Sequence, residues 1–318
     1  MKFAPISRYA LRETLGRQKR LTAASRRAAK HPQDAEAIHG LRVSIRRFTQ
    51  CLRIFDQLLD PAAPKQLRKR LRKLMDRCAA ARNCDVALDL LGQVGLAKSP
   101  SVSKLQKART QAERDLHRWL KTEHRRGFPN LQASRHPPDG DWKLDQSLED
   151  NLRRVLPLLA RDFFEAGSAA AVSGASAQAL HQFRLRAKRF RYTLELFERF
   201  YAREMVRGAQ ALKGLQDRLG AINDCVTTID LLGRDRRAVT AIRSLLDRRE
   251  VEFKHYWKSQ FALHGLAWWS TWLGRPARKA PRKILHAAVT AAPRKTARYG
   301  PRRPRPNPAS PELKSGRR

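Results

Sequence analysis

The feature that most constrains the fold of this chain is a helical pattern that occurs twice. The stretch IHGLRVSIRRF, residues 38–48, nearly returns as LHQFRLRAKRF, residues 180–190. At a constant offset of 142 residues, the basic positions of the first stretch have counterparts in the second: His39, Arg42, Arg46 and Arg47 become His181, Arg184, Lys188 and Arg189.

A second block follows in each half. LRKLMDRCAAARNCDVALDLL, residues 71–91, matches LKGLQDRLGAINDCVTTIDLL, residues 212–232, at an offset of 141 residues. Two blocks in the same order indicate a duplicated unit, because chance similarity between amphipathic helices would not preserve their order.

Apolar residues recur at steps of three and four along almost every segment, which predicts an all-α fold. At about 100° per residue, the first basic stretch has one polar stripe and one core face. The core face is Leu41, Ile45, Phe48, Leu52 and Phe55, and its counterpart is Phe183, Ala187, Phe190, Leu194 and Phe197. The stripe is His39, Arg42, Arg46, Gln50 and Arg53.

Breaks in this pattern predict the domain organisation. The stretch 125–143 is rich in Gly and Pro and predicts a loop between two lobes, at about residues 1–130 and 145–273. Residues 165–180 predict a short flexible connection. Residues 274–318 are rich in Pro, Ala, Arg and Lys, with Glu312 their only acid, and predict a disordered basic tail.

The basic stripes favour an anion as ligand. An ordinary solvated helix face mixes acids with bases to gain i,i+4 pairs, whereas these stripes place like charges one turn apart. The formal net charge of +38 also points to a polyanion, such as nucleic acid, an anionic membrane surface or a phosphate polymer. Arginine suits phosphate because its planar guanidinium can bind two oxygens at once. The candidate binding residues are His39, Arg42, Arg46, Arg47, Arg53, Arg68, Lys69, Arg72, Lys73, His181, Arg184, Lys188, Arg189, Arg191 and Lys213.

Two other functions compete with a phosphate polymer as ligand. The basic tail and a sequence pI of about 11.4 suit DNA or RNA, although few groups for base readout accompany the stripes. His39 and His181 suit a phosphocarrier or a metal site, but they lack nearby ligand partners and a nucleotide loop. Four carboxylates in the second blocks are of a type that can bind Mg²⁺, but we interpret them as helix caps or partners of the basic stripes: Asp85, Asp89, Asp224 and Asp230.

The remaining motifs predict a binding protein without catalytic activity or cofactor. The sequence has no Walker loop, no G-x-S-x-G and no H-E-x-x-H. Its four cysteines form no C-x-x-C pair, which fits buried thiols in a reducing cytosol. No apolar run is long enough to span a bilayer, so we expect no membrane partner.

The doubled motif resembles the CHAD domain family, the histidine-containing α-helical domain. The resemblance rests on H-x-x-R-x-x-x-R-R in one half and H-x-x-R-x-x-x-K-R-x-R-Y in the other, over roughly residues 5–265. It implies two four-helix bundles related by a pseudo-twofold axis around a basic central groove. It also implies binding of long-chain inorganic polyphosphate and association with polyphosphate granules in the cytoplasm. The sequence departs from the family at RNCD, where Asn83 stands in place of the equivalent Asp224. With no E-x-E-x-K segment before the lobes, the resemblance implies a binder without a hydrolase domain in this chain.

Overall fold

The computed structural model describes residues 5–32, 34–60, 62–123, 127–129, 131–134, 141–262 and 265–275. Over these residues the chain is all-α, as predicted, with one isolated β-bridge between Leu59 and Ala133. The predicted disordered tail lies outside the described residues from position 276 onward. The last described helix ends at Leu273.

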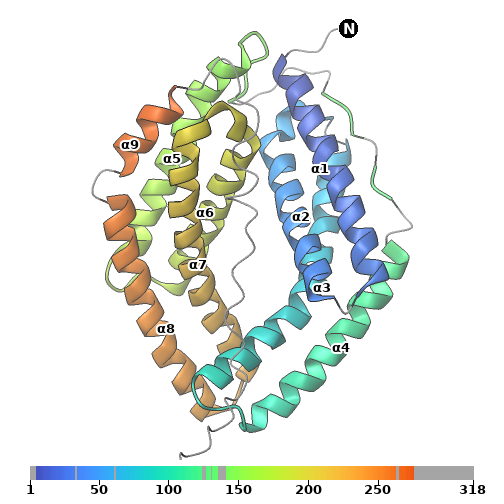
Figure 1. Ribbon diagram of the computed structural model, residues 1–318, viewed down its shortest axis with the longest axis vertical. Coiled ribbons are helices and arrows are strands. Elements are labelled where there is room, and N and C mark those ends of the chain that lie inside the picture. Colours follow the sequence, from blue (N-terminus) through green and yellow to red (C-terminus); the bar gives the residue numbers. More distant parts are fainter. Residues whose placement is uncertain are drawn as a thin grey trace, which may run out of the picture.

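Each half contributes helices in the same order. The first half contains α1 (Pro5–Lys30), α2 (Ala35–Ile54), the short η1 (Asp56–Leu58), α3 (Ala62–Gln93) and α4 (Pro100–Glu123). The second contains α5 (Leu148–Ala171), α6 (Ala177–Phe197), η3 (Glu198–Phe200), α7 (Ala202–Leu232), α8 (Arg236–Trp257), η4 (Lys258–Ala262) and α9 (Gly265–Leu273). Figure 1 shows the two sets of helices side by side.

The two basic helices begin at side-chain caps and bury the predicted core faces. Asp34 caps α2 by accepting from the backbone N–H of Glu36, and Ser176 caps α6 by accepting from that of Ala179. The predicted apolar residues of both helices are buried, which confirms the assignment of the core faces. Their burial fixes which side of each helix is left for the cations.

The halves meet where the C-terminal ends of α2 and α6 come together. The equivalent rings of Phe55 and Phe197 touch there, with centroids 5.9 Å apart. The Tyr9 hydroxyl donates to the carbonyl of Leu196 in the same region. Gln50, predicted in the exposed stripe, is instead buried at this interface, where its Nε2 donates to Thr193 Oγ1 at 3.4 Å. The pseudo-twofold relation between two four-helix bundles stays a prediction.

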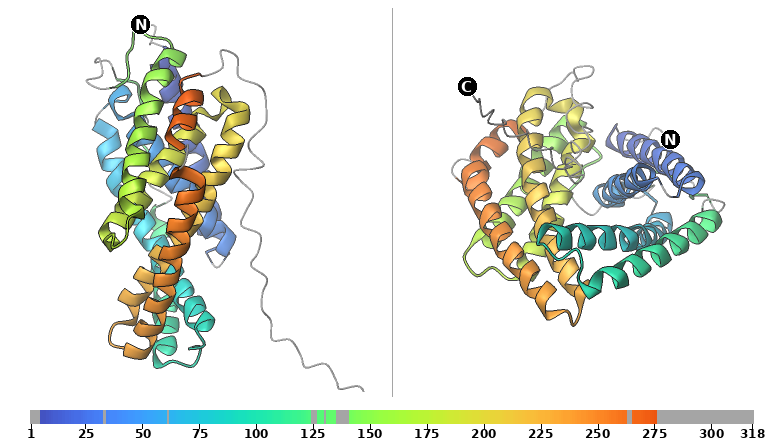
Figure 2. Two further views of the ribbon diagram at one scale, coloured as in Figure 1. Left: turned by 90° about the vertical axis from the view of Figure 1, so that its left-hand side faces the viewer. Right: turned by 60° about the horizontal axis from the view of Figure 1, so that its bottom comes forward.

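A second contact lies at the other end of the molecule, where α3 packs against α7. There, the equivalent Cys84 and Cys225 belong to one hydrophobic cluster. Asp235, the N-cap of α8, accepts from the hydroxyls of Ser99 at 2.6 Å and Ser101 at 2.7 Å. Seen from below, this end joins the long helices of both halves (Figure 2). All four cysteines are free and buried.

The predicted connection over residues 165–180 is shorter than expected, because α5 continues to Ala171 and leaves only residues 172–176 between the helices. The run of alanines at 169–171 favours helix. Gly167, two residues before this run in α5, lies directly against the Trp257 ring, where a side chain would collide. Glycine at this position therefore serves close helix packing rather than flexibility.

Candidate anion-binding site

The basic stripes of the two halves act on one another between α2 and α6. Five cations form what we call the central basic cluster: Arg42, Arg46, Arg82, Arg184 and Lys188. They come from α2, α3 and α6, so both halves of the chain contribute. Four of the five were predicted from the repeat, and the structure brings them together.

The charge crowding in the cluster is clearest at Lys188. Burial, and then the positive charges of Arg184, Arg46 and Arg42, lower the pKa of this lysine from 10.5 to about 7. The nearby Asp224 acts in the opposite direction but does not outweigh burial and the cations. Near neutral pH, an anion bound beside Lys188 would therefore favour its protonated form.

Two half-buried arginines of the cluster, Arg42 and Arg184, differ in their hydrogen bonds. Arg42 donates from Nη1 to the carbonyl of Cys78 at 2.8 Å, and burial with the charge of Arg46 lowers its pKa to about 10. The Nε of Arg184 is buried and, among the described residues, has no hydrogen-bond partner. A buried donor without an acceptor destabilises the fold. An anion that accepts from this Nε would remove that cost.

Asp224 is the carboxylate that faces this cluster. Burial raises its pKa, although Arg184, Arg82, Arg249 and Lys188 all pull it down. The equivalent position in the first half is Asn83, so the repeat supplies an acid on one side only. The cluster consequently keeps a positive charge that Asp224 cannot balance.

The two motif histidines lie at the border of the cluster. Burial and the charges of Arg46, Arg42 and Arg82 lower the pKa of His39, against the effect of Glu36. His181 lines a small pocket with Arg184 and Glu250, between α6, α7 and α8. Among the described residues, no three His, Cys, Asp or Glu side chains gather as a metal site would require.

Two predicted binding residues, Arg47 and Arg191, form ion pairs with one acid, Glu195, that was not predicted from the sequence. Arg47 Nε donates to Glu195 Oε2 at 2.9 Å across the interface, and Arg191 Nε donates to Glu195 Oε1 at 3.2 Å. Arg191 also donates from Nη1 to Gln216 Oε1 at 2.8 Å. The available signal was the i,i+4 spacing of Arg191 and Glu195.

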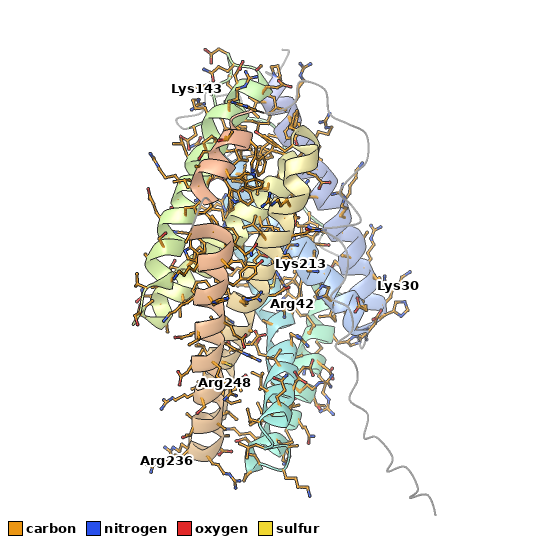
Figure 3. The ribbon with its side chains drawn as sticks, turned by 60° about the vertical axis from the view of Figure 1, so that its left-hand side comes forward. Lys30, Arg42, Lys143, Lys213, Arg236 and Arg248 are labelled. Carbon is orange, nitrogen blue, oxygen red and sulfur yellow. The ribbon has the colours of Figure 1, made fainter. Side chains whose placement is uncertain are left out.

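The other predicted residues lie apart from the cluster. Arg53 lies within electrostatic reach of Arg68, Arg72 and Arg189, and Arg68 pairs with Asp56. Lys69 and Lys73 are exposed on α3. Lys213, on α7, and Arg42 both lie midway along the molecule (Figure 3).

Arg82 belongs to the central basic cluster but was not among the predicted binding residues. It follows Cys78 by one helical turn on α3, and Arg42 binds the Cys78 carbonyl. Its charge acts on His39, Arg42 and Asp224. Because its counterpart by the repeat is Asn223, no basic pair marked this position in the sequence.

The lowered pKa of Lys188 predicts a pH-dependent stability without ligand. Between about pH 7 and 10.5 the unfolded chain holds a proton on this lysine that the folded chain has released. This group therefore makes the free energy of unfolding rise with pH across that window, and its full cost is present below pH 7. Urea unfolding at pH 7 and 9 should show a smaller rise for Lys188→Gln than for the wild type. The exposed-lysine control Lys69→Gln should behave as the wild type; equal slopes for all three would contradict the assignment.

Comparisons with known proteins agree with this architecture. A solved structure described as PptA from Streptomyces chartreusis is 16% identical, with a TM-score of 0.54, covering 84% of this chain and 99% of that one. The crystal structure of the CHAD domain from the plant Ricinus communis is 20% identical, with a TM-score of 0.51, covering 86% of this chain and 94% of that one. At these identities the likeness concerns the fold.

Two sequence comparisons complete the assignment. Among curated proteins, nothing matches this chain. The described helices include none that is long and apolar enough to cross a membrane. The family model for the CHAD domain matches residues 13–233, which cover both repeats of the basic motif. The chain therefore belongs to the CHAD domain family.

Proposed function

We propose that this protein binds long-chain inorganic polyphosphate through the central basic cluster, without catalysing a reaction. The observation that carries the proposal is the cluster itself, in which five cations from both halves face one carboxylate, Asp224. The CHAD domain family is linked to polyphosphate binding in general, which supports this choice of polyanion.

The chemistry of the cluster suits phosphate better than nucleobases. Arginine guanidinium groups bind phosphate oxygens in pairs, and Arg42, Arg46, Arg82 and Arg184 supply them. Base readout or stacking would call for Asn, Gln or aromatic side chains among the cations. Gln50 is buried in the contact with Thr193, so it is not free for that role.

Granule association and a cytoplasmic location belong to the same proposal. A protein that binds long polyphosphate chains at many cations would concentrate where such chains accumulate. The four buried, free thiols fit a reducing compartment.

The test is a competition between long polyphosphate and duplex DNA at physiological salt, on the full chain and on a chain cut after Gly274. We expect polyphosphate to be preferred by the full chain, because the cluster has phosphate chemistry without base readout. The cut should lower the affinity for DNA more than that for polyphosphate, because the removed residues are rich in Arg and Lys and add a sequence-independent attraction to any phosphate backbone.

Two outcomes would count against the proposal. A preference of the full chain for DNA would favour a nucleic-acid-binding protein. Loss of binding to both polymers in the shortened chain would assign the function to the tail instead of the cluster. Both measurements need a fixed salt concentration, because binding of either polymer weakens as salt rises.

A further inference from the structure

The two halves are not chemically equivalent where α2 and α6 meet. By the repeat offset, Arg47 on α2 corresponds to Arg189 on α6, and Arg53 on α2 corresponds to Glu195 on α6. One such position therefore carries a base in the first half and an acid in the second. The contacts across the interface therefore differ between its two sides.

On the Glu195 side, defined by Arg47, Arg191 and Glu195, each arginine has a carboxylate oxygen as its partner. Both carboxylate oxygens of Glu195 accept from an arginine, at 2.9 Å from Arg47 and 3.2 Å from Arg191. The Glu195 side chain is only 10% exposed. A second ligand would have to displace this buried acid, so the Glu195 side is closed to anions.

The Arg53 side is defined by Arg53, Arg72 and Arg189. Here a base, Arg53, occupies the position that the acid Glu195 occupies in the other half. Two contacts set the register of the two helices: Arg47 on α2 pairs with Glu195 on α6, and Gln50 donates to Thr193. Because residue numbers rise on α2 as they fall on α6, Arg53 comes opposite Arg189. The positive charge of Arg189 accordingly contributes to lowering the pKa of Arg53, after burial, Arg68 and Arg72.

The third cation on this side, Arg72, comes from the first turns of α3, which the neighbouring Arg68 holds in place. Arg68 Nη1 lies 3.5 Å from the carbonyl of Leu52 and pairs with the carboxylate of Asp56, which holds the first turns of α3 beside the end of α2. Arg72 follows one turn later and is exposed. Within the described part of the chain, no carboxylate forms an ion pair with Arg53, Arg72 or Arg189.

We propose that Arg53, Arg72 and Arg189 form a second anion-binding site, built by both halves, which takes linked phosphate groups. Three arginines without an acid repel one another, and a condensed phosphate offers several charged oxygens that planar guanidinium groups bind in pairs. The inference rests on the proposed function for its ligand and deepens it: the protein holds polyphosphate asymmetrically, on the Arg53 side and not on the Glu195 side.

The first test removes the site. We expect Arg53→Gln/Arg189→Gln to weaken binding of long polyphosphate by about five- to tenfold, the loss that two charge-assisted contacts in a solvent-exposed site would bring. The control Lys104→Gln/Lys107→Gln removes the same charge from exposed positions on α4 and should change binding less than twofold. Isothermal titration with long polyphosphate and, separately, with tripolyphosphate measures both.

The second test uses single substitutions that either open the Glu195 side to anions or close the Arg53 side. Glu195→Gln frees Arg47 and Arg191 and should raise the affinity for tripolyphosphate or its stoichiometry. Arg53→Glu gives Arg189 the acid that Glu195 gives Arg47, so it should close the Arg53 side and leave the melting temperature unchanged or higher. If the Arg53→Gln/Arg189→Gln variant fails to fold, Arg72→Gln tests the same side from the exposed surface of α3 and should weaken binding about threefold.

The outcomes separate the two proposals. Weakening by Arg53→Gln/Arg189→Gln with both probes supports a site that also takes short phosphates; weakening with the long chain alone supports a site for the extension of a bound chain. No excess over the lysine control with either probe overturns the second site, whereas the proposed function stands if the wild type still binds polyphosphate. A wild type that binds no polyphosphate overturns both.

Discussion

Replacing Arg46 and Lys188 together by glutamine is expected to weaken long-chain polyphosphate binding at least tenfold, while the fold without ligand stays as stable or becomes more stable. Both residues lie in the central basic cluster, where the charge of Arg46 contributes to lowering the pKa of Lys188. A charge-assisted contact contributes roughly 1.5–3 kcal/mol, so losing two exceeds a factor of ten in affinity.

The opposite sign for stability follows from the same crowding. Like charges one turn apart on a helix destabilise it by a few tenths of a kcal/mol, roughly 0.2–0.5 per pair. Arg42 and Arg46 form such a pair on α2, as do Arg184 and Lys188 on α6. Glutamine removes one member of each pair and keeps a similar stem length. Thermal melts without ligand measure this term.

Two further double variants sharpen the experiment. Lys104→Gln/Lys107→Gln removes the same charge from exposed positions on α4 outside the cluster and should cost far less affinity. His39→Gln/His181→Gln should also cost less, because the histidines lie at the border of the cluster. If instead the histidine pair abolishes binding and the Arg46/Lys188 pair leaves it intact, or an acid-labile phosphate forms on either histidine, the protein is a phosphocarrier.

The parts of the structure that depend on local periodicity could be predicted from the sequence. The core residues of α2 and α6, such as Phe48 and Phe190, are buried as expected because a 3.6-residue period places them on one face. Co-linearity of the repeated blocks predicted a duplicated unit, and the family resemblance implied a basic central groove. The equivalent cations Arg46 and Lys188 act on each other because their helices, α2 and α6, are in contact.

The parts that depend on contacts between the halves could not be predicted in the same way. Gln50 has the spacing of the exposed stripe, but the approach of α6 buries it against Thr193. Glu195 neutralises Arg47 from a helix 148 positions away in the chain, a distance that no local pattern reports. The low pKa of Lys188 arises from burial and from Arg184 on its own helix, to which Arg46 and Arg42 of the other half add.

The second large effect concerns the length of the ligand. Long polyphosphate is expected to bind at least roughly 10² times more tightly than orthophosphate at equal phosphate concentration. Each cation of the central basic cluster offers a weak site, and Asp224 opposes any single anion placed beside Lys188. Once one phosphate of a chain is bound, its neighbours are held at high effective concentration near the remaining cations.

A displacement series tests this reasoning with fluorescent long-chain polyphosphate as the reporter and orthophosphate, tripolyphosphate and unlabelled long chains as competitors. Tripolyphosphate should fall between the other two, because it spans some of the cations and leaves others unoccupied. The Arg46→Gln/Lys188→Gln variant should compress the series, because fewer linked contacts remain to be gained by a longer chain. Equal competition by orthophosphate in the wild type would mean that each phosphate binds independently, and the shared basic cluster would then have no part in selecting a polymer.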